Sequence, residues 1–252
     1  MSPRKSETNV LVNGGRKRVL VIQTGTAPSE IRARFGDFGE WFRRGLRLKP
    51  EQIRCVRVDC GETLPAPENV AAALVTGSGA MVTQRLEWSE RTAAWLLDAA
   101  AAQLPMLGVC YGHQLLAHAF GGRVDYNPRG REIGSVDIEM LPAAKDDALF
   151  DALPSRFAAQ ATHLQSVTLP PRDAVVLARS TLESHQIVRY ANKVWGVQFH
   201  PEFGVAQMRA YLRARAEAIT SEAIDVSALL QAVRPSPVSR SVLRRFVRLA
   251  RS

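Results

Sequence analysis

The sequence has few cysteines and no long hydrophobic run, and each absence narrows the class of protein. No stretch of about 18 consecutive apolar residues occurs, so we expect no membrane-spanning helix and no role at a membrane. The first 18 residues lack the apolar centre of a secretory signal. Cys55, Cys60 and Cys110 form neither a CxxC pair nor an even disulfide set. Together these absences predict a protein of the reducing cytoplasm.

The net charge of +9 is concentrated at the two ends of the chain. Residues 1–18 carry +4 and residues 234–252 carry +6, which leaves −1 for residues 19–233. The sequence therefore predicts a flexible basic N-terminus over 1–17, one domain over 18–233 that folds without its ends, and a basic C-terminal tail over 234–252. Because the body is almost neutral, a nucleic-acid partner is not expected.

The C-terminal tail leaves one alternative function open. Val242, Phe246 and Leu249 recur at helical spacing, so residues 241–252 can form a basic amphipathic helix. An isolated helix of about 12 residues is marginal in water, and a solvated or loosely docked tail is the simpler interpretation. A non-catalytic binding protein that acts through its basic tails is the least favoured of the functional hypotheses.

Apolar runs alternate with helical patterns along the first half of the chain. Buried strands are predicted at 18–25, 53–60, 70–79 and 105–110. Helical spacing, with Ser89 as a candidate N-cap, predicts helices at 29–46, 89–102 and 113–120. Short strands follow from about 123 to 200, before a final helix at 205–219. The pattern predicts an α/β fold with a mostly parallel central sheet, helices on both faces and a small antiparallel extension.

A cysteine between two glycines lies where a predicted strand meets a predicted helix. Residues 108–112 read Gly-Val-Cys-Tyr-Gly, the G-x-C-x-G form of a nucleophile elbow. The glycines leave room for a tight turn, and the following helix points its free N–H groups at the sulfur, which favours the thiolate. A buried cysteine at a strand end, with Gly108 and Gly112 incidental, is the alternative. The pattern favours Cys110 as a nucleophile.

A thiolate nucleophile needs a partner that moves protons, and His200 is the best placed of the five histidines. No two of the five have metal-ligand spacing, so no metal site is expected. His200 follows an apolar strand, at the end of the sheet where open α/β folds place their chemistry. Glu202 can hold the imidazole in the needed tautomer. Alone, these residues are a weak signal, and a capping histidine beside a surface glutamate explains them better, but together with the elbow they predict a Cys-His-Glu triad.

The segments Gly-Val-Cys-Tyr-Gly-His-Gln (108–114) and Phe-His-Pro-Glu-Phe (199–203), in that order, resemble the motifs of the class I glutamine amidotransferases. The resemblance covers roughly residues 18–220 and implies the flavodoxin-like α/β fold of that family. It also implies that Cys110 is the nucleophile, that His200 is the acid and base, and that Glu202 orients His200.

The resemblance extends to substrate binding. It implies an oxyanion hole of two backbone N–H groups, one from Tyr111 and one from Ser78 or Gly79 in the loop 76–80. Many relatives have Gly-Gly-Pro there, so the donor within the loop is left open. Gln114 matches the motif glutamine that helps to bind substrate. Further candidates near the glutamine site are His163 and Gln165, and also Arg129, Arg131 and Glu132, for which an ordinary strand-entry loop is the alternative.

The implied reaction is hydrolysis of the side-chain amide of glutamine through a γ-glutamyl thioester, without a cofactor. The released ammonia needs an acceptor, yet the sequence contains neither a G-x-x-x-x-G-K-[ST] loop nor a Ser-Gly-Gly-x-Asp pyrophosphatase loop. The resemblance is to stand-alone amidotransferases of the GMP-synthetase type, so a separate ATP-dependent synthase subunit is the expected partner, with an unidentified acceptor. A γ-glutamyl peptidase or hydrolase is the alternative, because the same triad attacks amides with a larger leaving group.

Overall fold

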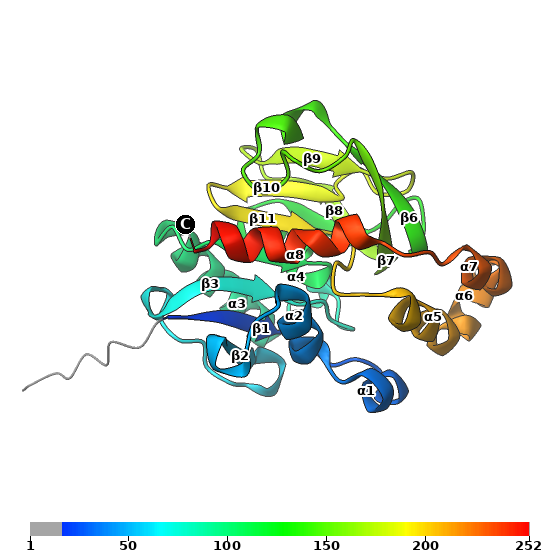
Figure 1. Cartoon of the computed structure of the whole chain (residues 1–252), viewed down its shortest axis with the longest axis horizontal. Coiled ribbons are helices and arrows are strands. Elements are labelled where there is room, and N and C mark those ends of the chain that lie inside the picture. Colours follow the sequence, from blue (N-terminus) through cyan, green and yellow to red (C-terminus); the bar gives the residue numbers. More distant parts are fainter. Residues whose placement is uncertain (1–16, 252) are drawn as a thin grey trace, which may run out of the picture.

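The apolar runs predicted as strands form the centre of one large sheet (Figure 1). The computed structural model describes residues 17–251, so residues 1–16 of the predicted basic N-terminus lie outside the described residues. Within the described range, nine strands form a sheet in the order β2-β1-β3-β4-β11-β10-β9-β6-β7, and β5 pairs with β8 in a second sheet. The strands are β1 (Arg18–Gln23), β2 (Ile53–Arg57), β3 (Val70–Val75), β4 (Met106–Val109), β5 (Arg123–Tyr126), β6 (Glu132–Met140), β7 (Arg156–His163), β8 (Gln165–Leu169), β9 (Val175–Arg179), β10 (Ile187–Ala191) and β11 (Val194–Val197).

The strand directions divide the large sheet into two parts. The strands β2, β1, β3, β4 and β11 run parallel, and β10, β9, β6 and β7 continue the sheet in antiparallel pairs. Val109 at the end of β4 pairs with Val197 at the end of β11. The segments that leave these two strands therefore start side by side, although they are far apart in the sequence. The arrangement confirms the predicted α/β fold with its antiparallel extension.

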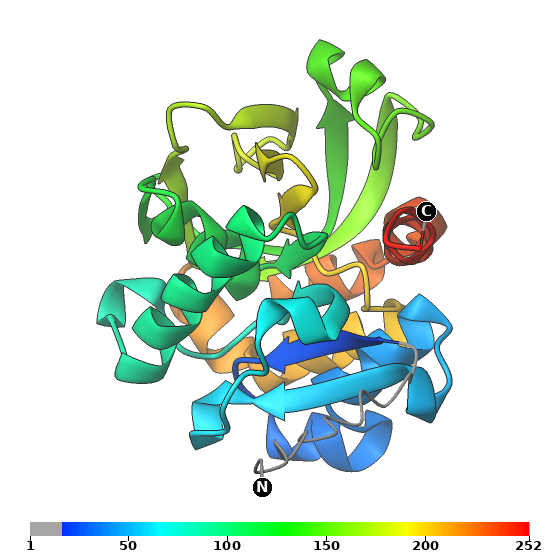
Figure 2. The same ribbon diagram turned by 90° about the vertical axis from the view of Figure 1, so that its left-hand side faces the viewer.

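Helices cover both faces of the sheet because successive strand residues point to opposite sides. In β1, Leu20 and Ile22 pack with α3 and α4, whereas Val19 and Val21 pack with α2 and α8. Figure 2 shows α8 on one side of the sheet and α3 and α4 on the other. Among residues 17–251, no helix is both long and apolar enough to cross a bilayer. The helices are α1 (Ser29–Phe35), α2 (Phe38–Leu46), α3 (Glu87–Ala101), α4 (Tyr111–Ala119), α5 (Val205–Ala214), α6 (Ala216–Ser221), α7 (Val226–Ala232) and α8 (Pro237–Leu249).

Two predicted helices are each divided in the structure. The predicted helix at 29–46 is interrupted between α1 and α2, where Asp37 accepts hydrogen bonds from the backbone N–H groups of Ala27 and Phe38. Its carboxylate thus starts a new helix instead of continuing the old one. The final predicted helix at 205–219 is likewise divided, into α5 and α6 at Arg215.

The prediction that Ser89 caps the helix expected at 89–102, which is α3 in the structure, is wrong. Helix α3 begins at Glu87, and Leu86 precedes it without a side-chain cap. The Ser89 side chain is buried and hydrogen-bonds the Tyr111 hydroxyl at 2.6 Å. Ser89 therefore links α3 to the first residue of α4 in the core, a tertiary contact that the local sequence does not reveal.

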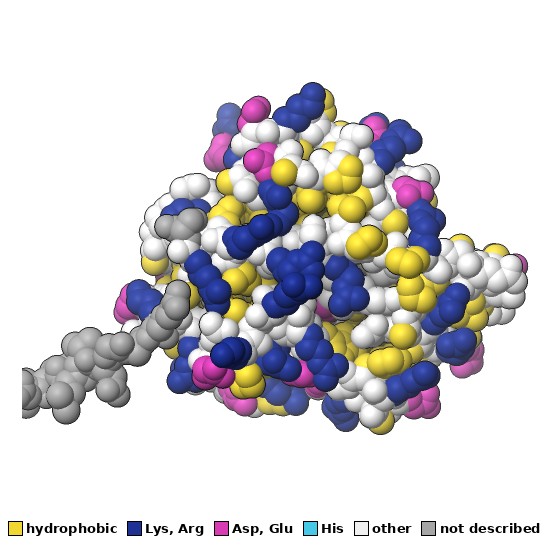
Figure 3. All heavy atoms as spheres, viewed as in Figure 1, with side chains coloured by type: hydrophobic (Ala, Val, Ile, Leu, Met, Phe, Trp, Pro, Cys, Tyr) yellow, Lys and Arg dark blue, Asp and Glu magenta, His cyan; other side chains and the backbone are white. Residues whose placement is uncertain are grey.

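The C-terminal segment differs most from its prediction as a separate tail. Helix α8 packs against α2 and β7, and Val242, Leu243 and Phe246 have no exposed side-chain surface. Arg240, Arg244 and Arg248 are exposed on its outer side, and Figure 3 shows Lys and Arg side chains across the middle of that face. The basic charge that suggested a solvated tail thus belongs to one side of an amphipathic helix whose other side completes the core.

Candidate active site

Cys110 occupies a sharp turn between β4 and α4. Its backbone has φ 52° and ψ −103°, a conformation that non-glycine residues rarely adopt. The Cys110 N–H donates to the Val197 carbonyl at 2.8 Å, which ties the turn to the end of β11. Such strain persists only where the surrounding structure enforces it, and it clusters at functional sites. The turn sets the sulfur at the N-terminus of α4, as the sequence predicted.

Glycines flank Cys110 because the backbone passes too close for any side chain. A Cβ on Gly108 would collide with the carbonyl group of Gly112, and a Cβ on Gly112 would lie 2.5 Å from the Val75 carbonyl oxygen. The Gly112 N–H also donates to the Thr76 carbonyl at 3.1 Å. The turn, the start of α4 and the end of β3 are therefore packed backbone against backbone.

We expect Gly112→Ala to destabilise the protein by at least about 2 kcal/mol, because the added methyl group must displace rigid backbone in a packed core. Thermal unfolding measures the effect. Gly79→Ala is the matched control, since nothing lies within 4 Å of a Cβ at Gly79. Equal stability of the two variants would contradict the close approach described for the elbow.

His200 and Glu202 lie in the segment that follows β11. The Glu202 carboxylate hydrogen-bonds His200 Nδ1 at 2.7 Å, and both side chains are buried. The His200 ring stacks on Phe203 with the ring centroids 4.3 Å apart. His200 Nε2 is buried without a hydrogen-bond partner among the described residues. The carboxylate thus fixes the tautomer and leaves Nε2 available for proton transfer.

The side chains of His200 and Cys110 meet beside Gly77. A Cβ on Gly77 would lie 2.9 Å from His200 Cε1 and 3.7 Å from Cys110 Cβ. The absence of a side chain at Gly77 therefore gives the imidazole the space it occupies beside the sulfur. Cys110, His200 and Glu202, predicted from separate motifs, lie together in the structure.

The electrostatics of the site favour a thiolate and an imidazolium. Burial opposes ionisation of Cys110, but the charge of the neighbouring His200 outweighs burial and lowers the pKa of the thiol. Burial also opposes the charged form of His200, yet the Glu202 carboxylate and the Cys110 sulfur raise its pKa to about 10. Both shifts favour a thiolate at Cys110 together with an imidazolium at His200.

The two predicted oxyanion elements lie next to Cys110. Tyr111 is the first residue of α4, so its N–H has no carbonyl partner within its own helix. Ser78 and Gly79 line the same cavity as Cys110 and Tyr111. The Ser78 hydroxyl donates to the Thr24 carbonyl at 2.6 Å and accepts from the Ala80 N–H at 3.1 Å. The Ser78 hydroxyl therefore helps to fix the conformation of the loop 76–80. The backbone N–H groups of this loop are the candidate donors to the oxyanion.

Two cavities meet at Cys110. The smaller, of about 50 Å³, is lined by Gln114, His163 and Gln165 among others, and Arg131 reaches it as well. The larger, of about 370 Å³, is lined by His200 and by residues of α1 and α5. The predicted substrate-binding residues Gln114 and His163 thus line the smaller cavity, and His200 lines the larger one.

The smaller cavity offers hydrogen-bond acceptors. Gln114 Nε2 donates to the Gln165 carbonyl at 2.6 Å and to Gln198 Oε1 at 2.9 Å, which assigns its own Oε1 as the free end of the amide. Gln165 Nε2 donates to Thr83 Oγ1 at 2.6 Å, and Gln165 Oε1 is buried without a partner. A substrate ammonium group would satisfy such acceptors.

His163 also lines this cavity, and each of its ring nitrogens has an acceptor as its neighbour. Its Nδ1 lies 3.0 Å from the Gln165 carbonyl oxygen and its Nε2 lies 2.9 Å from Glu132 Oε2. Both neighbours are acceptors, so both ring nitrogens must donate, which requires the charged imidazolium. Burial lowers the pKa of His163, but the hydrogen bond and charge of Glu132 raise it above its usual value. Glu132 is thus the ion-pair partner of His163.

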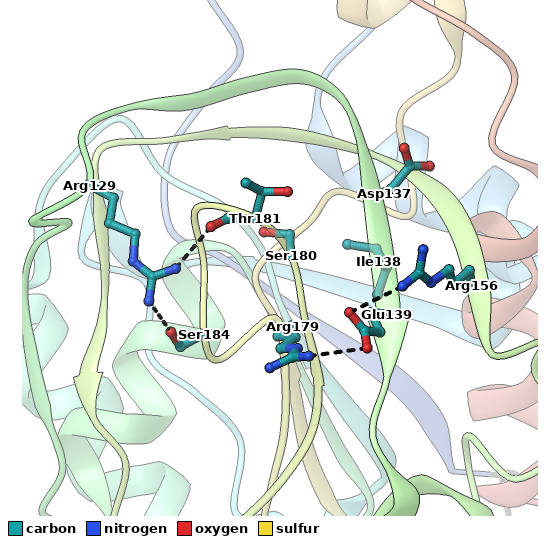
Figure 4. Close-up of a pocket in the computed structure, with 9 residues that line it drawn as sticks. All are labelled: Arg129, Asp137, Ile138, Glu139, Arg156, Arg179, Ser180, Thr181 and Ser184. Carbon is teal, nitrogen blue, oxygen red and sulfur yellow. Dashed lines mark hydrogen bonds and ion pairs between the residues drawn. The ribbon is translucent and has the colours of Figure 1, made fainter.

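The candidate arginines of the 129–132 segment have different neighbours. Figure 4 shows Arg129 in a separate pocket, where it donates to the Thr181 carbonyl and to the Ser184 hydroxyl. Arg129 therefore fits the structural alternative, a loop contact. Arg131 reaches the cavity beside Cys110, but its guanidinium forms a two-fold ion pair with Glu222 at 2.6 and 2.8 Å.

Several residues around Cys110 had no sequence signal. Arg32 and Tyr211 line the larger cavity, and Thr162 and Arg215 border both cavities. Arg32 and Arg215 come from opposite ends of the chain and belong to no short motif. Within residues 17–251, no three His, Cys, Asp or Glu side chains gather as a metal site would require.

The chain is similar to glutamine-hydrolysing proteins. The family model described as "Glutamine amidotransferase class-I" matches residues 38–217. The glutamine-hydrolysing GMP synthase subunit of Methanothrix thermoacetophila is 32% identical over 169 residues, which cover 67% of this chain and 84% of that protein. The glutamine-hydrolysing GMP synthase of Aeropyrum pernix is 37% identical over 165 residues, or 63% of this chain but only 29% of that protein.

Solved structures show the same fold. A glutamine amidotransferase from Thermotoga maritima superposes with a TM-score of 0.74 at 24% identity, over 94% of this chain and all of that one. A glutamine amidotransferase from Methylobacillus flagellatus has a TM-score of 0.67 at 25% identity, over 94% of this chain and 91% of that one. Because the family model spans more than half of its length, the chain belongs to the class I glutamine amidotransferase family.

Proposed function

We propose that the protein hydrolyses the side-chain amide of glutamine through Cys110, His200 and Glu202. The observation that carries the proposal is the strained turn of Cys110 beside a histidine whose other nitrogen is fixed by a buried carboxylate. This arrangement combines a low-pKa thiol with a positioned acid, the two requirements of thiol-based acyl transfer. The family match supports the assignment.

The reaction follows from the positions of these groups. The Cys110 thiolate attacks the amide carbon of glutamine, and the backbone N–H groups of Tyr111 and of the Ser78–Gly79 loop hold the oxyanion. The carbon–nitrogen bond breaks as His200 Nε2 gives its proton to the departing nitrogen, which leaves as ammonia. His200 then takes a proton from water, and the resulting hydroxide cleaves the γ-glutamyl thioester to glutamate and free thiolate.

Glutamine recognition is proposed for the smaller cavity. Gln114 and Gln165 present acceptor oxygens there, which suit the α-ammonium group of the substrate. The His163–Glu132 ion pair acts through Gln165, because His163 holds the Gln165 carbonyl. We assign these residues to positioning the γ-glutamyl group against the sulfur, with no cofactor in the half-reaction.

The ammonia produced would serve a separate ATP-dependent synthase subunit in the cytoplasm. The support is that the matched Methanothrix protein is itself named as one subunit of GMP synthase. The match covers 29% of the Aeropyrum protein and 56% of the corresponding subunit from Methanopyrus kandleri. A reducing compartment keeps the Cys110 thiol free for catalysis.

Glutamine turnover by site variants tests the proposal. We expect His200→Ala to lower kcat/KM at least about a hundredfold, because proton transfer to the leaving nitrogen is lost. Glu202→Gln keeps an acceptor for Nδ1 but loses the charge, so we expect a loss of about tenfold. Released ammonia is measured, with the exposed Glu217→Gln as the control. Unchanged turnover in His200→Ala would refute the proposed acid.

A further inference from the structure

The ion pair of His163 and Glu132 follows from the register of the antiparallel extension. The two residues lie directly opposite each other on β7 and β6, so their side chains leave the sheet on the same side. Both side chains are buried. A buried imidazolium is costly unless its partner carries a full negative charge and both groups have hydrogen bonds. The charge on His163 therefore depends on the groups that hold Glu132.

The loop 180–186, which joins β9 to β10, holds Glu132, although no sequence motif marks this loop. The Ser180 hydroxyl donates to Glu132 Oε1 at 2.5 Å, and Gln186 Nε2 donates to Glu132 Oε2 at 2.6 Å. His163 Nε2, 2.9 Å from Glu132 Oε2, is the third donor. Both carboxyl oxygens thus face donors, an arrangement that fits an ionised carboxylate and offers no acceptor for the proton of a neutral acid.

Further hydrogen bonds fix these two donors of the loop in place. The Ser180 N–H donates to the Glu183 carbonyl at 2.7 Å, and the Ser180 hydroxyl accepts from the Glu183 N–H at 3.1 Å. Gln186 Nε2 also donates to the Ser180 hydroxyl at 3.2 Å, which fixes the orientation of the Gln186 amide. The Gln186 carbonyl accepts from the Gln198 N–H at 2.9 Å, two residues before His200. Ser180 and Gln186 are buried, so the carboxylate is held inside the protein.

His163 presents the positive end of the ion pair to the reaction centre. His163 lines the smaller cavity together with Cys110, whereas Glu132 does not line it. Burial opposes ionisation of the Cys110 thiol, and the charge of His200 and, to a smaller extent, that of His163 lower its pKa.

Other charged or titratable groups also surround the sulfur and the imidazolium. Around Cys110 they are Glu202, Arg32, Arg131, Arg215 and Tyr211. Around His163 they are Glu183 and His113. Of these groups only Glu183 is hydrogen-bonded to Ser180 or Gln186, and it is bonded through its backbone. A change in the two donors therefore reaches the sulfur through Glu132 and His163.

We propose that Ser180 and Gln186 are positioning residues: by holding Glu132 ionised they keep His163 as an imidazolium, whose charge helps to keep Cys110 as the thiolate. This role is separate from the contact between His163 and the Gln165 carbonyl. Without the two donors, the buried carboxylate takes the proton of His163, and the pair becomes neutral. The positive charge next to the sulfur is then lost. The role requires the proposed nucleophile, but it does not depend on which amide the nucleophile attacks.

Alkylation of Cys110 by iodoacetamide tests the proposal without glutamine turnover, because only the thiolate reacts. In the full chain, the peptide that contains Cys110 is followed by mass spectrometry as a function of pH. We expect the midpoint of the profile to lie at higher pH in Ser180→Ala and in Gln186→Met. On the acid side of the midpoint both variants should react at least about threefold more slowly than wild type, and above it at nearly the same rate. Ser184→Ala, in the same loop, is the matched control, because the Ser184 hydroxyl accepts from Arg129 instead (Figure 4).

A spectroscopic measurement on the wild type needs no loop variant. In protein labelled isotopically at the histidine nitrogens, the NMR signals of His163 are assigned by their loss in His163→Gln. Both ring nitrogens of His163 should be protonated at neutral pH. A neutral His163 in the wild type would overturn the proposal, whether or not the loop variants fold.

The alkylation profiles separate a role in charge from a role in shape. Profiles that are unchanged in Ser180→Ala and Gln186→Met would overturn the proposal even if KM for glutamine rises, because the loop would then only support the cavity. If the shift appears but the wild type does not hydrolyse glutamine, the glutaminase proposal fails and the positioning role of the loop stands.

Discussion

Replacement of Cys110 by alanine should abolish ammonia release from glutamine, with a loss of at least about a thousandfold in kcat. Without the sulfur no thioester forms, and the remaining groups can only orient water. Cys110→Ser should be almost as inactive, because a serine hydroxyl has a much higher pKa than a thiol and His200 is poised to stabilise a thiolate. The measurement is ammonia and glutamate production at saturating glutamine.

The loss must arise from chemistry and not from unfolding. Cys110→Ala keeps the Cβ that the turn already accommodates, so we expect its melting temperature to stay within a few degrees of wild type. Cys60→Ala, at an exposed cysteine, is the matched control and should keep full activity. Wild-type protein quenched with acid during turnover should carry a γ-glutamyl group on Cys110. Full activity in Cys110→Ala would end the amidotransferase mechanism proposed for this chain.

The sequence revealed the candidate triad because its signals are local. Gly108 is required by its close approach to Gly112 within the turn, and Gly112 by its close approach to Val75 at the end of β3, but both glycines are visible in the sequence beside Cys110. His200 and Glu202 are two residues apart, and a direct hydrogen bond joins them. The parallel pairing of β4 with β11 then brings the two motifs together. The alternation of strands and helices predicts a parallel sheet, but it does not predict that these two strands are neighbours in it.

The remaining residues of the site depend on long-range packing. Arg32 and Arg215 reach one cavity from α1 and from the junction of α5 and α6. Neither position has a local conformation or spacing that marks it, and arginine is common in this chain. Ser89 similarly resembles a helix cap in its local context, yet its hydroxyl is used by Tyr111 in the core. Only the folded chain distinguishes such residues from ordinary polar residues of the surface.

Charge misled the interpretation of the C-terminus because net charge does not report which side of a helix is buried. Residues 234–252 carry six arginines and no acidic residue. The apolar residues between them nevertheless fall on one side of α8 and pack into the cluster formed with α2. Arg245 also contributes to docking, because it donates to the Leu149 carbonyl at 2.6 Å and pairs with Asp151.

Deletion of residues 234–252 should therefore unfold the protein or leave it aggregated, contrary to the expectation from sequence that residues 17–233 fold alone. Val242, Leu243, Phe246 and Val247 are at most 6% exposed. Burial of one such side chain contributes about 1.5–3 kcal/mol, so the four together contribute about 6–12 kcal/mol, comparable to the whole stability of a domain. The deletion would also expose the partner surface on α2.

A point variant tests the same contact in a protein that still folds. Phe246→Ala should cost about 3–5 kcal/mol, and thus lower the melting temperature by about 10 °C, because a fully buried ring leaves a cavity between α8 and the sheet. Arg248→Ala, on the exposed side of the same helix, should change it by at most about 2 °C. Equal melting temperatures for the two variants, or a deletion that melts like the wild type, would show that α8 is a dispensable tail. Tyr211 in α5 and Arg215 at the C-terminal end of α5 line the larger cavity of the site, and α5 packs on the same side of the sheet as α8. We therefore expect loss of α8 to remove glutamine hydrolysis together with the fold.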